Sequence, residues 1–425
     1  MLDIKFVRTN PDSVRADLRK RNDSIRLAWV DDLLASDQRV RELKVEIDAF
    51  RQRRNTISRE INAGRKAGRD TTDLLEEAKS LPDRIKELDA VKEEEEAKVR
   101  YYLMRLPNIL DESVPYGEDA SQNQVIRREG TPQTFGFELK NHGQLAVEKG
   151  WADFERAART SGAGFSYLKG NLALLDMALQ RYAIDLLMRN GFTPVIPPYM
   201  MNRKSYEGVT DLGDFEDVMY KIDGMDSYLI ATSEHPICSM FQDEIFDEKD
   251  LPLRLAGLSP CFRKEIGSHG IDTKGLFRVH QFHKVEQFVF CKPEESVAIH
   301  EELLANAEEL YTNLGLPYQV VLICTGDIGT VAAKKYDIEV WMPREEEYRE
   351  VVSCSNCTSY QAVRLGMRMR DPSDFEMKHH IHTLNSTEVA TSRTMRAILE
   401  NYQQEDGSVV IPEVLRPYMN DQEYL

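Results

Sequence analysis

The stretch that decides the fold is GLFRVHQFHKVEQFVF, residues 275–290. Its many aromatic and β-branched residues predict a strand from Phe277 to Phe290. Because side chains alternate in direction along a strand, Arg278, Phe282 and Glu286 would share one face. A guanidinium, an aromatic ring and a carboxylate in one row suit a binding surface better than a hydrophobic core. The alternative is a solvent-facing strand with scattered charges.

The segment before this strand repeats the pattern. LPLRLAGLSPCFRKE, residues 251–265, predicts a preceding strand on which Arg263 and Glu265 share a face. The connection between the two strands, IGSHGIDTKG at 266–275, contains three glycines. We therefore predict a hairpin over 257–290 whose charged face binds a ligand.

Short β-type runs and a few helices make up the rest of the C-terminal part. An apolar-rich helix is predicted over 171–189, where Asn190-Gly191 forms a suitable C-cap. An extended, proline-rich strand follows at 191–200, and further helices are expected at about 294–314 and 389–402. Many short strands with hairpin-like joins predict an α+β domain on a mainly antiparallel sheet.

The N-terminal part has a different period. Apolar residues recur at steps of three and four, first over 33–61 and again over 74–102. Two long heptad helices joined by a tight turn predict an antiparallel α-helical coiled coil. The predicted turn is AGRKAGRD, residues 63–70, with Gly64 and Gly68 as helix breakers.

Two prolines add expectations for these helices. Asn10-Pro11 predicts a helix start, because asparagine is a favoured N-cap and proline is favoured at the first helical position. Pro82 lies inside the second apolar series, so it should kink that helix or shift its start.

Length and composition favour two domains. A chain of 425 residues exceeds one ordinary core. Proline and glycine become dense after Leu106. We therefore predict a helical arm over 1–106, a linker over 107–135 and the main domain over 136–425.

The net charge is divided unevenly between these parts. The whole chain carries −17, but residues 1–110 contain 24 Lys and Arg against 22 Asp and Glu, whereas the remainder contains 31 against 50. Basic residues gather near the predicted turn of the arm. Such a cluster is either a solvated helix face or a surface that contacts nucleic-acid phosphates. Its members are Arg51, Arg53, Arg54, Arg59, Arg65, Lys66 and Arg69.

The cysteines and the apolar runs bear on the compartment. All six cysteines lie between Cys238 and Cys357, which does not resemble a disulfide framework and favours a reducing cytoplasm. The N-terminus has no apolar signal core, and no run approaches the ~20 apolar residues of a membrane span.

Several motifs in order resemble seryl-tRNA synthetases of the bacterial type, which are class II aminoacyl-tRNA synthetases. The segment ending at Pro198 resembles the first class II signature, which forms a dimer interface. The hairpin resembles the second, and NSTEVATSRTMRAILEN at 385–401 resembles the third. More specific to the seryl enzymes are TSE at 232–234, CTGDIGTVAAKKYDIEVWMP at 324–343 and VIPEVLRPYM at 410–419.

The resemblance, which covers nearly the whole chain, implies a function. Such an enzyme activates L-serine with ATP and Mg²⁺ to seryl-adenylate and transfers it to tRNA(Ser), with tRNA(Sec) as a further acceptor. It implies a cytoplasmic homodimer with no membrane partner, whose coiled-coil arm binds tRNA through Arg51, Arg53, Arg54, Arg59, Arg65 and Lys66. The glycine-rich connection of the hairpin would be where the tRNA arrives.

The resemblance also implies the site residues. Arg263 and Arg393 would be catalytic, Phe282 would stack on adenine with Arg393 on its other side, and Glu350 and Ser353 would hold Mg²⁺. The ATP site would comprise Arg263, Lys264, Glu265, Arg278, Val279, Phe282, Glu350, Val351, Val352, Ser353 and Arg393. The serine site would comprise Thr232, Ser233, Glu234, Arg263, Glu286, Asn385 and Thr387.

Some features lie outside this pattern. Cys354 and Cys357 form a lone CxxC, and we expect no zinc there. Glu388 stands where this family more often has a small residue, and we expect it to point away from serine. His269, His280 and His283 are expected to have structural roles, because the carboxylate of serine is already ionised and needs no general base.

Two other classes of protein fit part of the sequence. An amino-acid ligase that loads carrier proteins would share the main domain but lack the arm. A structural or RNA-binding relative with an inactive site would lack residues such as Arg263 and Arg393.

Overall fold

The structure is a computed structural model that describes residues 1–212, 216–265, 275–371 and 378–425. The chain forms two compact units, of which the smaller is Leu2–Leu106 and the larger is Met1 with Pro107–Leu425. No helix in the part of the chain that the structure describes is long and apolar enough to cross a membrane.

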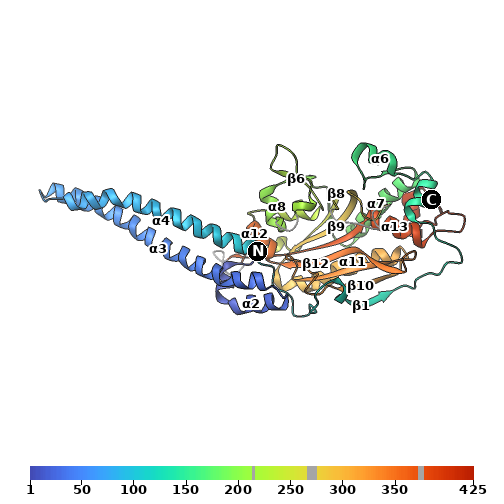
Figure 1. Cartoon of the computed structure of the whole chain (residues 1–425), viewed down its shortest axis with the longest axis horizontal. Coiled ribbons are helices and arrows are strands. Elements are labelled where there is room, and N and C mark those ends of the chain that lie inside the picture. The colour runs from blue at the N-terminus through green and yellow to red at the C-terminus, as the bar shows by residue number, and fades with distance from the viewer. Residues whose placement is uncertain (213–215, 266–274, 372–377) are drawn as a thin grey trace. The chain divides into compact units, whose positions relative to one another are not determined.

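The smaller unit is helical. It consists of α1 (Ile4–Thr9), α2 (Pro11–Lys20), α3 (Ser24–Lys66) and α4 (Thr72–Arg105). Figure 1 shows α3 and α4 running side by side as a long antiparallel pair. Their contact buries the predicted apolar positions, including Leu43 and Ile47 of α3 against Ile85 and Leu88 of α4. The predicted coiled coil is therefore confirmed.

Two local expectations for the arm need correction. Gly64 does not break the helix, because α3 continues to Lys66 and the turn follows at Gly68, whose φ is +65°. Gly64 serves close packing instead, since a Cβ there would lie 2.7 Å from Cγ2 of Thr71. Of the two effects expected of Pro82, the shifted start is wrong, because the second helix runs from Thr72 to Arg105 with Pro82 inside it.

The larger unit is built on an eight-stranded sheet in the order β1-β10-β11-β12-β15-β9-β8-β4. All neighbours are antiparallel except β4 and β8. The predicted α+β class is confirmed. Its strands are β1 (Gln124–Glu129), β4 (Thr193–Val195), β8 (Leu253–Phe262), β9 (Gln281–Cys291), β10 (Tyr318–Leu322), β11 (Lys334–Met342), β12 (Glu347–Thr358) and β15 (His382–Ala390).

The larger unit also contains helices and three small sheets among the described residues. The helices are α5 (His142–Glu148), α6 (Phe154–Ser161), α7 (Asn171–Arg189), α8 (Arg203–Val209), α10 (Glu234–Ser239), α11 (Ser296–Asn313), α12 (Tyr360–Leu365) and α13 (Thr391–Asn401). The remaining strands form small sheets: β2 (Ala152–Asp153) with β3 (Tyr167–Leu168), β5 (Met200–Asn202) with β6 (Ser227–Leu229), and β7 (Ile245–Phe246) with β13 (Arg368–Arg370) and β14 (Lys378–His379).

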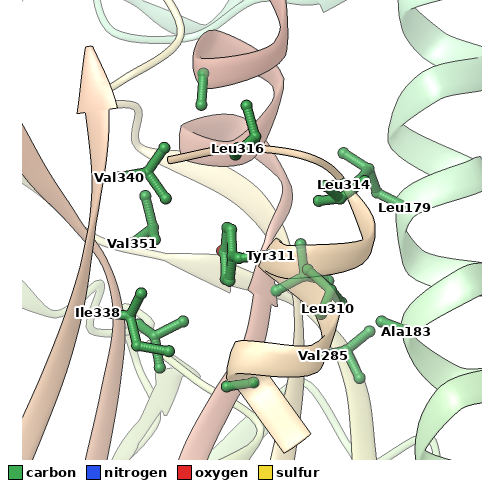
Figure 2. Packing of buried hydrophobic residues seen from close by; sticks show 14 of the residues in the cluster. Leu179, Ala183, Val285, Leu310, Tyr311, Leu314, Leu316, Ile338, Val340 and Val351 are labelled. Atoms are coloured by element: carbon green, nitrogen blue, oxygen red, sulfur yellow. The ribbon is translucent and has the colours of Figure 1, made fainter. Parts of the chain in front are cut away.

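The two faces of β9 have different neighbours because its side chains alternate. Val285 and Val289 point into the main core with α7, α11 and α13. Figure 2 shows this core, with Tyr311 of α11 beside Val351 of the sheet. On the other face, Phe288 and Phe290 pack in a second core with α8, α10 and α12.

Several strand and segment boundaries differ from those predicted. The strand predicted from Phe277 begins only at Gln281, and the preceding strand ends at Phe262. Arg263, Glu265 and Arg278 therefore follow or precede strands, and strand alternation does not fix their directions. Residues 266–274, the predicted glycine-rich connection, lie outside the described residues. The segment predicted as a linker belongs to the larger unit, where 124–129 forms the edge strand β1.

Candidate active site

A cleft of about 370 Å³ opens on the face of β9 opposite to the main core. Phe282, Lys284 and Glu286 line it from β9, two residues apart, and continue the row that ends in Phe288 and Phe290. Strands β12 and β15, the start of α13 and the segment before α10 contribute the other walls. The row of side chains predicted from strand alternation is therefore present from Phe282 to the end of β9.

One end of the cleft is acidic and enclosed. Thr387 donates a hydrogen bond from Oγ1 to Oε2 of Glu286 over 3.3 Å, and Lys284 pairs with the same carboxylate. Asn385 donates from Nδ2 to Oε1 of Glu234 over 3.1 Å. Two carboxylates therefore face one ammonium group within this end.

Burial changes the ionisation of both carboxylates. It raises the pKa of Glu234 to about 7, with the charge of Glu286 as the next cause. Burial also raises the pKa of Glu286, although Lys284 opposes this shift. Lys284 and, less strongly, Arg263 favour the ionised forms of both acids, and a cationic group of a ligand would do so further.

The other end of the cleft is rich in guanidinium groups and aromatic rings. Arg263 lies over the ring of Phe282, 5.5 Å from its centroid, and donates from Nε to the Ala231 carbonyl over 3.3 Å. Arg393 lies 5.2 Å from the centroid of Phe277 and donates to the Glu350 carbonyl over 2.9 Å. Arg278, Val279 and Glu265 also line the cleft. Planar cations beside aromatic rings suit a ligand with phosphates and a flat base.

The two predicted metal ligands, Glu350 and Ser353, both line this cleft. Burial alone would raise the pKa of Glu350, but Arg393 and then Lys335 outweigh it and lower that pKa. An ionised carboxylate and a hydroxyl are hard ligands of the kind Mg²⁺ accepts when phosphates supply the remaining ones. No group of three or more His, Cys, Asp and Glu side chains that could hold a metal occurs among the described residues.

Three predicted residues do not line the cleft. Ser233 is fully buried and donates to the Gly257 carbonyl over 3.2 Å. Val352 packs in the main core. Lys264 is outside the lining set, and its backbone N–H donates to the Val218 carbonyl over 2.8 Å.

Prediction also missed residues that line the cleft. Lys284 was within reach, because it lies midway between Phe282 and Glu286 on the same strand face. Lys335 lies on β11, within the motif at 324–343, but no pattern in the sequence gave it a role in the site. The other lining residues not predicted are Val209, Thr210, His235, Phe277, Val331, Ala390 and Ser392.

Glu388 and the histidines that were expected to have structural roles have clear neighbours. Glu388 is fully buried and accepts from Nε2 of Gln287 over 2.9 Å, on the core side of the sheet rather than in the cleft. His283 pairs with Asp176 over 2.8 Å, and His280 stacks on Phe165. His269 lies outside the described residues.

The cysteines of the CxxC have different neighbours. Cys354 donates from Sγ to the His300 carbonyl over 3.8 Å, whereas Sγ of Cys357 accepts from Nδ2 of Asn385 over 3.6 Å.

The basic residues of the arm, within the smaller unit, fall into two groups. Arg53 pairs with Glu77 through two hydrogen bonds of 2.7 Å, and Arg51 pairs with Asp89 at 3.1 Å. The others are exposed and form no ion pair with any residue that the structure describes: Arg54, Arg59, Arg65, Lys66 and Arg69.

The fold and the cleft define a class of protein. Residues 219–402 match the family model described as the tRNA synthetase class II core domain (G, H, P, S and T). This stretch contains most of the cleft, so the larger unit is a class II aminoacyl-tRNA synthetase domain.

The particular family follows from the whole chain. Residues 1–110 match the model described as the seryl-tRNA synthetase N-terminal domain. Serine–tRNA ligases of Methanocella arvoryzae and Methanospirillum hungatei are 72% and 70% identical to the chain, with both proteins covered completely. The structure of the seryl-tRNA synthetase of Pyrococcus horikoshii complexed with ATP is 50% identical, with a TM-score of 0.94 over 100% of this chain and 99% of that one.

The chain therefore belongs to the seryl-tRNA synthetase family and is an ATP-dependent aminoacyl-tRNA ligase for serine. These three relatives are archaeal. They confirm the family and give no support to the qualifier "bacterial type".

Proposed function

We propose that the cleft joins the carboxylate of L-serine to the α-phosphate of ATP, with serine at the acidic end and ATP along the guanidinium-rich end. The observation that carries this division is the separation of charge within one cleft. Glu234 and Glu286 lie at the acidic end, and Arg263 and Arg393 lie beside aromatic rings at the other. The ATP complex of the Pyrococcus horikoshii relative supports an ATP site in this fold.

At the serine end, Glu234 and Glu286 supply acceptors for the ammonium group. Thr387, Asn385 and Thr232 add polar groups for the hydroxyl. Such a site discriminates against alanine, because the missing hydroxyl would leave buried polar groups without partners. Ser233 is proposed to act only through the backbone, since its side chain points to Gly257.

At the ATP end, Arg263 is proposed to bridge the serine carboxylate and the α-phosphate. The carboxylate oxygen attacks the α-phosphorus and pyrophosphate leaves, so the step needs no general base. Catalysis then rests on positioning and on neutralising the charge of the phosphates by Arg263, Arg278 and Arg393. Mg²⁺, held by Glu350 and Ser353 together with ATP phosphates, would supply further neutralisation.

For base recognition, Phe282 is proposed to stack on adenine. Arg263 lies over this ring in the structure, 5.5 Å from its centroid, so adenine would stack on the face of the ring that Arg263 leaves open or displace that guanidinium. The backbone around Val279, Val351 and Val352, together with Lys264 and Glu265, would complete the ATP site.

The second step transfers serine to tRNA(Ser). For this step, the arm is proposed as the unit that binds the tRNA. Its match to the seryl-tRNA synthetase N-terminal domain supports this proposal and speaks against a carrier-protein ligase. Charging of tRNA(Sec), a homodimer and a cytoplasmic location are proposed from the family resemblance.

Serine-dependent ATP–pyrophosphate exchange by the purified full chain tests this function. We expect exchange with serine, much less with alanine, and a requirement for Mg²⁺. Absence of exchange with serine, or equal exchange with alanine, would contradict the proposal. Charging of total tRNA with radiolabelled serine tests the second step.

A further inference from the structure

We propose that His142 is a positioning residue for the ATP end of the cleft, because its ring ties the backbone at Leu276 to Glu400 of α13. The residue lies on α5, outside every signature motif, and does not line the cleft. The proposal rests on the assignment of ATP to this end.

Both nitrogens of the His142 ring are occupied, and the ring is only 2% exposed. The backbone N–H of Leu276 donates to Nε2 over 3.1 Å, and Nδ1 lies 2.9 Å from Oε1 of Glu400. Since a backbone N–H can only donate, Nε2 must be the unprotonated acceptor. The proton is therefore on Nδ1, which donates to Glu400.

The backbone around this bond is built for close approach. Gly275 has φ of +123°, and a Cβ there would lie 2.2 Å from Nε2 of His142. A Cβ on Gly143 would lie 3.0 Å from Cα of Gly275. Glycine at both positions thus lets the start of α5 reach the backbone that leads into the cleft.

Glu400 continues the connection to the cleft. Its Oε1 also accepts from Nε of Arg396 over 3.0 Å, and Arg396 pairs with Glu345. Arg396 and Arg393 of α13 both lie against the ring of Phe277, 4.6 and 5.2 Å from its centroid. Phe277 follows Leu276 directly and lines the cleft.

One histidine therefore links two segments that the ATP site needs together. One segment carries Phe277 and Arg278, and the other carries Arg393. Losing the bond to Leu276 would leave a buried N–H without an acceptor and free the first segment relative to the second.

Two substitutions separate the two bonds of the ring. H142Q places an amide oxygen near the position of Nε2, so it keeps an acceptor for Leu276 but loses the bond to Glu400. H142N places an amide nitrogen near the position of Nδ1, so it keeps the donor to Glu400 but loses the acceptor for Leu276. H300Q is the matched control, because His300 is an equally buried histidine that bonds the Cys354 carbonyl over 3.0 Å.

In pyrophosphate exchange, we expect H142N to raise KM for ATP about tenfold, which is the effect of one lost buried hydrogen bond. H142Q and H300Q should change it by no more than about twofold, and KM for serine should stay within about twofold in all three. Unchanged KM for ATP in H142N with lowered thermal stability would mean a merely structural role and overturn the proposal. A larger effect in H142Q than in H142N would overturn it as well.

A second measurement does not depend on activity. Nitrogen-15 spectra of the histidine rings in the full chain, with the His142 signals assigned by their loss in H142Q, should show the neutral tautomer protonated on Nδ1. Protonation on Nε2 would overturn the proposal. This result stands whether or not serine-dependent exchange is found, so failure of the inference is distinguishable from failure of the proposed function. It also tests the two bonds of the ring if H142N does not fold.

Discussion

Lys284 forms an ion pair with Glu286 inside the cleft, and neither side chain is more than 7% exposed. Both lie on the same face of β9, two residues apart. A buried carboxylate without a partner takes up a proton, so the ammonium of Lys284 favours the ionised form of Glu286. Glu286 can then accept a hydrogen bond from Thr387 and, as proposed above, from the ammonium of serine.

We predict that K284M lowers kcat/KM for serine about 100-fold, because Glu286 would lose the cation that favours its ionised form and would bind the serine ammonium less well. Pyrophosphate exchange at varied serine concentration measures this effect. K292M is the control, since Lys292 pairs with Glu248 at the surface over 3.0 Å with side-chain exposures of 21% and 39%. It should change kcat/KM by less than about twofold. An equal effect of the two variants would remove the role given to Lys284.

Serine binding should weaken as the pH falls through about 7. Burial, and then Glu286, raises the pKa of Glu234 to about 7. Below that pH the carboxyl of the free enzyme is protonated and neutral, and it must lose its proton to accept the serine ammonium. KM for serine should therefore rise up to about tenfold per pH unit below pH 7 and level off above it.

Proton release gives an independent test of the same group. Near pH 7, serine binding should expel part of a proton, so its calorimetric enthalpy should depend on the ionisation enthalpy of the buffer. A second carboxyl group, that of Asp337, also has its pKa raised by burial to about 7. Asp337 lies beside Lys335 and Glu350 and is not among the residues proposed to bind serine. E234Q should abolish both the pH dependence and the buffer dependence. If the wild type shows neither, the role of Glu234 is wrong.

The heptad pattern predicted the arm well because apolar positions of α3 pack against those of α4 in two clusters along the pair. The hairpin was harder. An apolar pattern extended the strand to Phe277, but the backbone N–H of Leu276 donates to His142 and that of His280 donates to the Gly164 carbonyl. These partners come from elements more than a hundred residues earlier, so no local pattern could show where β9 begins.

The residues that line the cleft also divide into those that the sequence could predict and those that it could not. Residues that repeat along one strand face, such as Phe282 and Glu286, could be predicted from alternation. Lys335 could not, because it reaches the cleft only through the order of β11 and β12 in the sheet. Val352 shows that a motif includes residues for the core, since its side chain lies in the main core while Ser353 lines the cleft.

The arm should bind tRNA through its unpaired cations rather than through all of its basic residues. Replacing Arg65, Lys66 and Arg69 together by alanine should raise KM for tRNA and lower the salt slope of binding by roughly 0.7–0.9 per lost phosphate contact. Filter binding at several salt concentrations measures this slope. Pyrophosphate exchange should be unchanged.

R53A is the control for the arm, because Arg53 is held by Glu77. It should affect the salt slope much less than the triple variant. If R53A lowers the slope as much as the loss of the three exposed residues, the division of the arm into paired and tRNA-contacting cations is wrong.

The proposed dimer should form through the segment from Tyr167 to Met200. Met177 and Met188 of α7 are 63% and 50% exposed, and Ile196 is 70% exposed. A separation of eleven residues is close to three helical turns, so the two methionines lie on one face of α7. We expect these exposed apolar side chains, together with others of the same segment, to form the dimer interface. Tyr167, Tyr199 and Met200 add to the same segment, each more than 40% exposed.

We predict that the wild type sediments as a dimer and that the double variant M177D/I196D sediments as a monomer, because two charges would have to be buried without partners. V297D is the matched control, since Val297 is 66% exposed on α11, outside this segment. It should remain dimeric. A wild type that sediments as a monomer at micromolar concentration would exclude the dimer, whereas a dimeric M177D/I196D would mean that the two chains meet through another face.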